Sequence, residues 1–199
     1  MKRGKPIAQR IVKESDRIAN ITKELFGFAR DDHNKSIFVD ICPLIRSAID
    51  LIEKKIHHQG VGIEFDCSKS LPKTQLYPQG LQQVVINLID NAADACRDKD
   101  IPLSEKVVKV SCDVVEKDEK YLCLEGSGRG IGMAPEVLVK AKETFFSTKP
   151  SSKGTGLGLS IVTDIVNRHN GELDIASVEG ECTKVKIYIP YRGRLISHG

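Results

Sequence analysis

The stretch "QGLQQVVINLIDNAADACRDK" carries two asparagines, Asn87 and Asn91, inside an otherwise apolar helical pattern. Because they are four residues apart, they lie on one face of a helix, although asparagine is a poor helix former. A buried amide without a partner costs about 1–3 kcal/mol, so two in register indicate a shared polar ligand. An amide carbonyl suits Mg2+, which keeps most of its waters and binds through few protein groups plus phosphates. The alternative is that both amides cap nearby loops.

Glycines supply a second candidate site. In "GTGLGLSIVTDIVNRHNG", Gly154, Gly156 and Gly158 run directly into an amphipathic helix. Backbone N–H groups at a helix start, left uncovered by glycine, form an anion site for which phosphate is the natural occupant. Another glycine-rich turn, "GSGRGIG", follows the strand-like run "KYLCLE". A single Gly-x-Gly-x-Gly pattern is weak evidence for a nucleotide, so the combination carries the argument.

These groups sit in a chain of ordinary globular composition, with 199 residues, 40% of them apolar and 29% charged. The formal charge of +3 is small and the lysines are dispersed among acids, so we expect no nucleic-acid partner. No apolar run approaches the roughly 18 residues of a membrane span. We therefore expect a cytoplasmic location, with membrane contact only through segments outside this chain.

Six cysteines show neither a Cys-x-x-Cys pair nor a histidine-flanked metal spacing. This pattern favours reduced cytosolic thiols over disulfides or zinc.

Periodicity and turn signals divide the chain into three parts. Residues 1–32 contain a narrow apolar seam at alternating spacings of three and four, which predicts a long, coiled-coil-like N-terminal helix that needs partner helices. A core helix of a larger domain is the alternative. Residues 33–192 form the main domain, with amphipathic helices at 39–56, 79–99 and from 158, and strands at 61–68, 107–118, 120–125 and within 171–190. Residues 193–199 are a tail.

Four segments in fixed order resemble the conserved boxes of sensor histidine kinases, within the superfamily of gyrase, heat-shock chaperone, histidine kinase and mismatch-repair ATPases. They are "NLIDNAADA", "GSGRGIG", "ETFFSTK" and "GTGLGLSIV", and the N-terminal seam resembles the second helix of the kinase dimerisation hairpin. The resemblance implies an α/β fold, a two-layer α/β sandwich with a mixed, mostly antiparallel sheet and helices on one face. It also implies ATP and Mg2+ as cofactors, a homodimer through the N-terminal helix, and a response regulator as partner of the complete kinase.

The resemblance assigns roles to single residues. Asn91 would hold Mg2+, Asn87 would face the phosphates or the waters of the metal, and Lys149 would lie near the triphosphate, so that Asn87 and Lys149 are the implied catalytic residues. Residues 131–153 would form the ATP lid, with Phe145 and Phe146 as apolar anchors, and Thr183 would lie near the adenine although Cys182 stands where many members have glycine. The implied nucleotide-binding residues are Asn87, Asn91, Gly126, Gly128, Gly130, Ile131, Phe146, Thr148, Lys149, Gly154, Thr155, Gly156, Leu157, Gly158 and Thr183.

Position 87 also indicates the reaction. In the hydrolytic branches of this superfamily a glutamate stands four residues before the magnesium asparagine, whereas Asn87 has no basic lone pair to accept a proton. Transfer of the γ-phosphoryl group to a protein side chain, catalysed by positioning and charge neutralisation, is therefore the expected reaction. No histidine of this chain precedes the acidic and polar residues of a phosphoryl acceptor, so we expect a fragment that begins after the acceptor helix.

The family pattern Asp-x-Gly-x-Gly places an adenine-binding aspartate at position 126, which is glycine here. Strand alternation sends Gly126 inward and Glu125 to the opposite face, so Glu125 is not a simple substitute. Three explanations stay open: a recent substitution in a working kinase, a natural pseudokinase, or a different reading of the base. A nucleotide-independent scaffold module is the alternative function, and a serine kinase of the anti-sigma type is a third.

Overall fold

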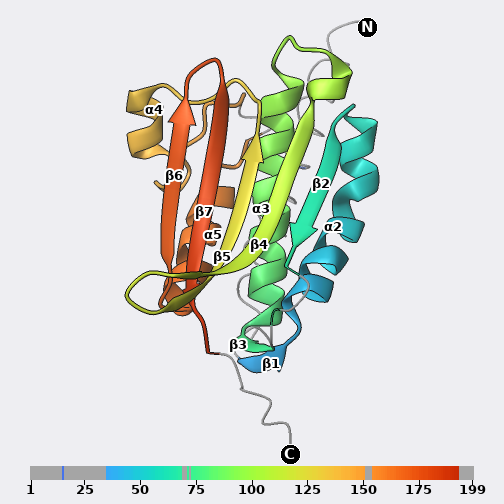
Figure 1. Cartoon of the computed structure of the whole chain (residues 1–199). Helices are drawn as coiled ribbons and strands as arrows, with labels where there is room; N and C mark the ends of the chain where they lie inside the picture. The colour runs from blue at the N-terminus through green and yellow to red at the C-terminus, as the bar shows by residue number, and fades with distance from the viewer. Residues whose placement is uncertain (1–14, 16–34, 69–70, 72, 151–153, 193–199) are drawn as a thin grey trace, which may run out of the picture.

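The computed structural model of the chain describes residues 15, 35–68, 71, 73–150 and 154–192. The predicted N-terminal helix and C-terminal tail therefore lie outside the described residues, Ser15 excepted. The described part contains one domain with two layers, a sheet and a layer of helices (Figure 1).

The main sheet has five strands in the order β2-β4-β5-β7-β6. These strands are β2 (Gly62–Cys67), β4 (Val107–Glu116), β5 (Lys120–Gly128), β7 (Cys182–Pro190) and β6 (Glu172–Val178). Only the β2–β4 pair is parallel, and the other three neighbouring pairs are antiparallel. The predicted mixed, mostly antiparallel sheet is confirmed.

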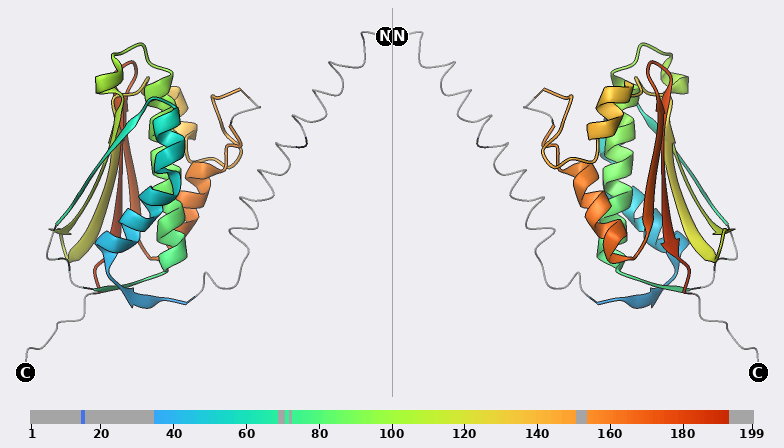
Figure 2. Two further views of the ribbon diagram at one scale, coloured as in Figure 1. Left: turned by 90° about the vertical axis from the view of Figure 1, so that its right-hand side faces the viewer. Right: turned by 90° about the vertical axis from the view of Figure 1, so that its left-hand side faces the viewer.

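Three helices, α2 (Ile41–His58), α3 (Pro78–Arg97) and α5 (Gly158–Arg168), cover one face of this sheet (Figure 2). The central one is α3, which packs against both α2 and α5. Its inward stripe is fully buried at Val84 and Ile89. Because α3 lies between its neighbours and over β4 and β5, it fixes the position of any polar side chain on its remaining face.

Alternation along the strands explains why only one face carries helices. In β4, Val108, Val110 and Cys112 are buried, whereas Lys109 and Ser111 between them are exposed. Apolar side chains thus point to the helices and polar ones to solvent, as expected for an antiparallel sheet with one solvated face.

Some short elements are not predicted from the sequence. A second sheet pairs β1 (Ile37–Val39) with β3 (Thr74–Leu76), and β3 lies between the predicted strand at 61–68 and the predicted helix at 79–99. A 3-10 turn, η2 (Leu103–Glu105), precedes β4. Elements of three residues contain too few positions for a periodicity to stand out. In residues 133–153 the sequence predicts a helix and a polar loop, and the short helix α4 (Pro135–Lys140) forms there.

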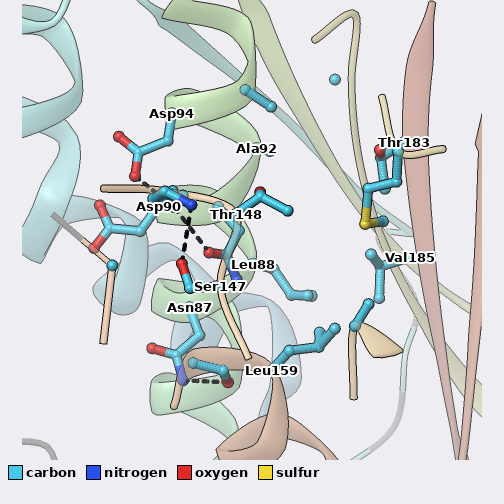
Figure 3. A pocket seen from close by; sticks show the side chains of 18 of the residues that line it. Asn87, Leu88, Asp90, Ala92, Asp94, Ser147, Thr148, Leu159, Thr183 and Val185 are labelled. Atoms are coloured by element: carbon cyan, nitrogen blue, oxygen red, sulfur yellow. Dashed lines mark hydrogen bonds and ion pairs between the residues drawn. The ribbon is translucent and has the colours of Figure 1, made fainter. Parts of the chain in front are cut away.

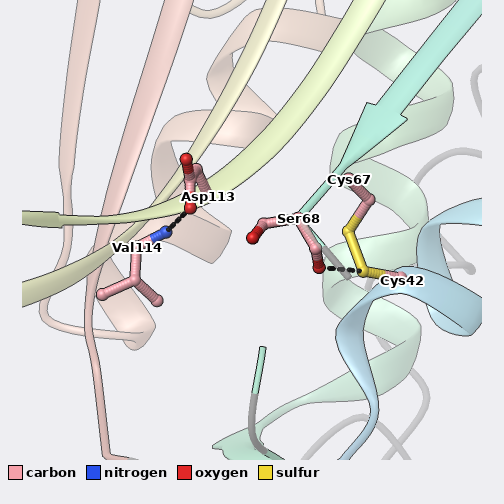
Figure 4. The surroundings of a disulfide bond; sticks show 5 residues. All are labelled: Cys42, Cys67, Ser68, Asp113 and Val114. Atoms are coloured by element: carbon pink, nitrogen blue, oxygen red, sulfur yellow. Dashed lines mark hydrogen bonds between the residues drawn. A yellow bond between two sulfur atoms is a disulfide. The ribbon is translucent and has the colours of Figure 1, made fainter. Parts of the chain in front are cut away.

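A disulfide joins Cys42, at the start of α2, to Cys67, at the end of β2 (Figure 4). The prediction of reduced cysteines is therefore wrong for this pair, because residues 25 apart in sequence are brought together only by the packing of α2 on β2. The free cysteines of the described part are Cys96, Cys112, Cys123 and Cys182. Burial raises the pKa of Cys112 to about 12, so that thiol is a poor nucleophile.

Within the described residues, no helix combines the length and apolar character required to cross a bilayer.

A buried histidine links the end of α5 to the start of α3. The backbone N–H of Tyr77 donates to His169 Nε2 at 3.1 Å, so the ring proton lies on Nδ1, which contacts the Ile165 carbonyl at 2.8 Å. Burial lowers the pKa of His169 below its ordinary 6.5, although the bond to Ile165 opposes this shift. Protonation would place a charge in the core and remove the acceptor for Tyr77.

We expect this histidine to make stability depend on pH. Its folded pKa is depressed, so the unfolded chain binds the proton more tightly and the free energy of unfolding falls as pH drops below 6.5 towards the folded pKa. Urea denaturation of wild type and His169→Gln between pH 5 and 8 checks this. The variant should lose that part of the pH dependence, whereas His57→Gln, at an exposed position, should retain it. Equal pH profiles for wild type and His169→Gln would contradict the assignment.

Candidate functional site

A pocket of about 480 Å3 opens between α3, strands β5, β6 and β7, and the α4–α5 segment, meaning here residues 141–150 and 154–157. This volume falls within the range of small-molecule sites. Figure 3 shows α3 with its polar side chains on one side of the pocket and strand residues Thr183 and Val185 across from them.

The strand side of the pocket is mainly apolar. Leu88 from α3, Gly126 from β5 and Val185 from β7 line it, together with Ile131, Met133, Val137 and Ile175. Thr183 adds a hydroxyl there, and its Oγ1 lies 2.7 Å from Ser177 Oγ. Ser177 also accepts a hydrogen bond from the Met133 backbone N–H, so β6 fixes both Thr183 and the backbone that follows β5.

The helix side is polar. Asn87, Asn91 and Asp94 of α3 and Asp98 at its C-cap follow one another at spacings of four, three and four, which places them in one row facing the pocket, and Asp90 lies beside that row. Opposite them stand Phe146, Ser147, Thr148, Lys149, Gly154, Thr155 and Gly156 of the α4–α5 segment, and Gly158 of α5. An apolar compartment joined to a polar one matches a ligand with a ring system and a charged tail.

The two asparagines differ in their contacts. Asn87 is half-buried, its Oδ1 accepts from Gln83 Nε2 at 2.9 Å, and its amide donates to the Gly158 carbonyl at 3.1 Å. Asn87 thus ties α3 to the start of α5. Asn91 is exposed to the pocket. The expectation that both asparagine side chains are buried is therefore met only in part by Asn87 and is wrong for Asn91.

The residues present fit a magnesium ion that is held mainly by the phosphate groups of a bound small molecule. Among the described residues, no group of three or more histidine, cysteine, aspartate or glutamate side chains could enclose a metal. Asn91 Oδ1 is an amide oxygen open to the pocket. One such oxygen plus phosphates and water is a donor set that Mg2+ accepts.

Lys149 crosses from the α4–α5 segment to α3. Its Nζ lies 2.6 Å from Asp94 Oδ2 and 3.4 Å from Asn91 Oδ1. Asp94 also accepts from Arg97 Nη1 at 2.6 Å. Burial alone would raise the pKa of Asp94, but the hydrogen bond and charge of Lys149, with a contribution from Arg97, hold it below the usual range. The carboxylate is therefore ionised at neutral pH.

Nearly all the predicted nucleotide-binding residues line this pocket, and Gly130 and Leu157 are the exceptions. Leu157 is only 3% exposed and belongs to the core. A Cβ on Gly130 would lie 2.5 Å from Ala95 Cβ, so this glycine permits close packing on α3. Binding by the remaining residues stays a prediction. Asp94 is not among the predicted residues, although a helical wheel places it one turn after Asn91 and therefore beside it.

The two phenylalanines behave differently. Phe146 lines the pocket, whereas Phe145 is 67% exposed and has φ 68°, so the prediction of an apolar anchor is wrong for Phe145. Its backbone N–H donates to the Gly156 carbonyl at 2.9 Å. The left-handed φ of Phe145 turns the backbone there, so Phe146 lines the pocket while the neighbouring Phe145 side chain faces solvent.

The predicted orientation of Glu125 is confirmed. Its carboxylate pairs with Lys184 at 3.1 Å and Lys186 at 3.5 Å on the solvated face of the sheet. Gly126 faces the pocket, and a Cβ there would meet only Leu88, at 3.4 Å and beyond. Its φ lies outside the left-handed region. Nothing in the backbone therefore requires glycine at this position.

The fold and the family model define the class of protein. Residues 77–193, more than half of the chain, match the model of the Histidine kinase-, DNA gyrase B-, and HSP90-like ATPases, and the chain belongs to that family. The resemblance noted in the sequence is thereby confirmed at this level.

The chain is similar in sequence to known kinases. The chain is 30% identical over 187 residues to sensor histidine kinase ZraS of Escherichia coli O157:H7, covering 92% of this chain and 38% of that protein. It is 28% identical over 182 residues to sporulation kinase E of Bacillus subtilis (strain 168), covering 92% of this chain and 23% of that kinase. The chain thus spans less than two fifths of the length of either relative.

Solved structures show the same fold. Full-length ShkA in complex with AMPPNP matches with TM-score 0.68 and 22% identity over 80% of this chain and 32% of that one. The Acinetobacter baumannii histidine kinase AdeS matches with TM-score 0.69 and 18% identity over 97% of this chain and 88% of that one.

Proposed function

We propose that this chain is the ATP-binding catalytic domain of a sensor histidine kinase. It binds ATP with Mg2+ in the pocket beside α3, and within the complete kinase it donates the γ-phosphoryl group to a histidine outside this chain. The complete kinase acts as a homodimer on the cytoplasmic side and passes the phosphoryl group to a response regulator. The sensor kinase relatives and the family match support this assignment.

One observation carries the proposal: a single pocket joins an apolar compartment to a row of polar groups beside a glycine-rich helix start. The base fits between Leu88 and Val185. The triphosphate then runs towards Asn91 and the N-terminus of α5, where unpaired backbone N–H groups attract anions. AMPPNP, an ATP analogue, is bound in the ShkA structure of this fold, which supports a nucleotide here.

Three residues would form the phosphate-binding end of the site. Asn91 would hold Mg2+, which neutralises phosphate charge when bound. Lys149 would add a cation from the facing segment, and Asn87 would keep the start of α5 at a fixed distance from α3. Because Asn87 is an amide with both ends bonded to protein, it does not activate water, and phosphoryl transfer is favoured over hydrolysis.

We expect Asn91→Ala to lower the affinity for ATP in the presence of Mg2+ by about tenfold, the loss of one charge-assisted contact. Titration calorimetry with and without EDTA measures this. In wild type Mg2+ should strengthen binding, and in Asn91→Ala that gain should disappear. Asn167→Ala is a matched control, because Asn167 is an exposed α5 amide outside the pocket lining.

Wild-type chain that binds neither ATP nor ADP at millimolar concentration would contradict the proposal and favour the scaffold function instead. The missing carboxylate at position 126 is the observation behind that alternative. If Asn91→Ala leaves ATP binding unchanged, residues other than Asn91 hold the metal.

A further inference from the structure

The ion pair between Lys149 and Asp94 crosses the pocket at the polar end. Both side chains are about three-quarters hidden, with 29% and 21% of their surfaces exposed, so the pair is less screened than a surface salt bridge. Other hydrogen bonds near Lys149 stay within the α4–α5 segment, such as Lys149 N–H to Ser147 Oγ at 3.1 Å and Gly154 N–H to the Pro150 carbonyl at 3.1 Å. The ammonium of Lys149 instead connects this segment to α3.

This placement conflicts with ligand binding. Lys149 Nζ is 3.4 Å from Asn91 Oδ1, the oxygen proposed for Mg2+. A divalent cation at that oxygen would lie within a few ångströms of the ammonium and repel it. Phosphate oxygens would in turn compete with Asp94 for the same three N–H donors. A magnesium nucleotide at Asn91 therefore competes with both present contacts of Lys149 to α3.

We propose that Asp94 is a positioning residue that holds Lys149 against α3 until a magnesium nucleotide displaces it. Binding then exchanges the Lys149–Asp94 pair for a contact between Lys149 and phosphate. This inference rests on the proposed function. Asp94 keeps a partner after the exchange, because Arg97 stays within hydrogen-bonding distance on the same helix. That partner lowers the cost of breaking the pair.

Two alternative roles for Asp94 predict different results from the proposed one. If Asp94 itself held Mg2+, its removal would weaken binding of magnesium polyphosphates. If it served only to order α3 through Arg97, its removal would change stability and leave Lys149 unaffected. A cycle of single and double variants separates these roles, because only the proposed role requires Lys149.

The experiment measures binding of ATP and of inorganic tripolyphosphate, both with Mg2+, to Asp94→Asn, Lys149→Met and the double variant of the full chain. Tripolyphosphate carries no base, so the lost carboxylate at position 126 has no effect on it. We expect Asp94→Asn to raise tripolyphosphate affinity about three- to tenfold. In the Lys149→Met background the same substitution should change affinity less than about twofold. Asp98→Asn is the charge-matched control, since Asp98 lies on the same row and pairs with Arg97 but not with Lys149.

Hydrogen exchange without any ligand gives an independent readout. Amides of residues 145–149 should exchange faster in Asp94→Asn than in wild type, and those in Asp98→Asn should not. Faster exchange with no polyphosphate or ATP binding by any variant would reject the proposed function while supporting the Lys149–Asp94 restraint. Unchanged exchange, weaker binding in Asp94→Asn, or an equal gain in the Lys149→Met background would overturn the inference.

Discussion

Gly126→Asp is expected to raise the affinity of this chain for ATP by about 10- to 150-fold. A hydrogen bond to a charged group contributes roughly 1.5–3 kcal/mol, which corresponds to that range. The adenine amino group is the donor, and the new carboxylate is the acceptor. Wild type should therefore bind ATP weakly, through phosphate and Mg2+ contacts more than through the base.

The structure accommodates this substitution. Gly126 pairs with Val110 and Val185 in the middle of the sheet, so its position is fixed by strands on both sides. A Cβ would stand 3.4 Å from Leu88 Cβ, an ordinary contact, and the extended backbone suits any residue. The carboxylate would point into the apolar end of the pocket. Because an unpaired buried carboxylate is costly, Gly126→Asp should also lower stability without nucleotide and regain it with ATP.

Comparison with GTP tests the direction of the new bond. Guanine presents a carbonyl oxygen where adenine presents its amino group, so the carboxylate should repel it and the gain should be confined to ATP. Gly126→Ala is the matched control, because it adds the Cβ without an acceptor and should change neither affinity by more than about twofold. Calorimetry on the three proteins with both nucleotides is the measurement. Equal gains for ATP and GTP would place the base elsewhere in the pocket.

Features encoded along one element could be predicted from the sequence. Alternation in β5 placed Leu122, Leu124 and Gly126 on one face and Glu125 on the other, and the ion pairs of Glu125 confirm it. The helical period likewise placed Asn87 and Asn91 together on α3. Both results depend on periods of 2 and 3.6 residues, which any sequence displays directly.

Features formed by contacts between different elements could not be predicted from the sequence. The Cys42–Cys67 disulfide and the Lys149–Asp94 pair join residues from different elements, 25 and 55 positions apart. Their pairing depends on how α2 packs on β2 and how the α4–α5 segment crosses α3. The exposed side chain of Phe145 follows from a left-handed backbone that no local pattern marked, since phenylalanine rarely adopts it.

The first glycine-rich turn shows a related limit. The sequence analysis assigned it to nucleotide binding, yet two of its glycines are required by packing. Ile131 between them donates to the Ala95 carbonyl and accepts from the Gly180 N–H, at 3.1 and 2.7 Å. The end of β5 is thereby held between α3 and the β6–β7 turn, and no side chain fits on the backbone at Gly130 or Gly132.

Gly132→Ala is accordingly expected to destabilise the domain by at least about 3 kcal/mol. Gly132 has φ +66°, and a Cβ there would overlap the Val178 carbonyl oxygen and lie 2.7 Å from the carbonyl carbon. The left-handed backbone alone costs a non-glycine residue roughly 1–2 kcal/mol. The contact adds to this because Val178 ends β6 and is held by its pairing with Cys182, so its carbonyl cannot move without breaking that pairing.

Gly180→Ala separates the two costs. Gly180 has φ +75°, close to that of Gly132, but a Cβ there would meet nothing within 4 Å. It should therefore cost only the left-handed backbone term of about 1–2 kcal/mol. Urea denaturation of both variants gives the difference, which measures the steric term at Gly132. Because Gly132 also lines the pocket, the backbone shift that relieves this clash should weaken ATP binding in Gly132→Ala and leave it unchanged in Gly180→Ala. Equal stabilities would mean that the backbone after β5 moves away from β6 freely, and the turn would then be a flexible edge of the site instead of a fixed one.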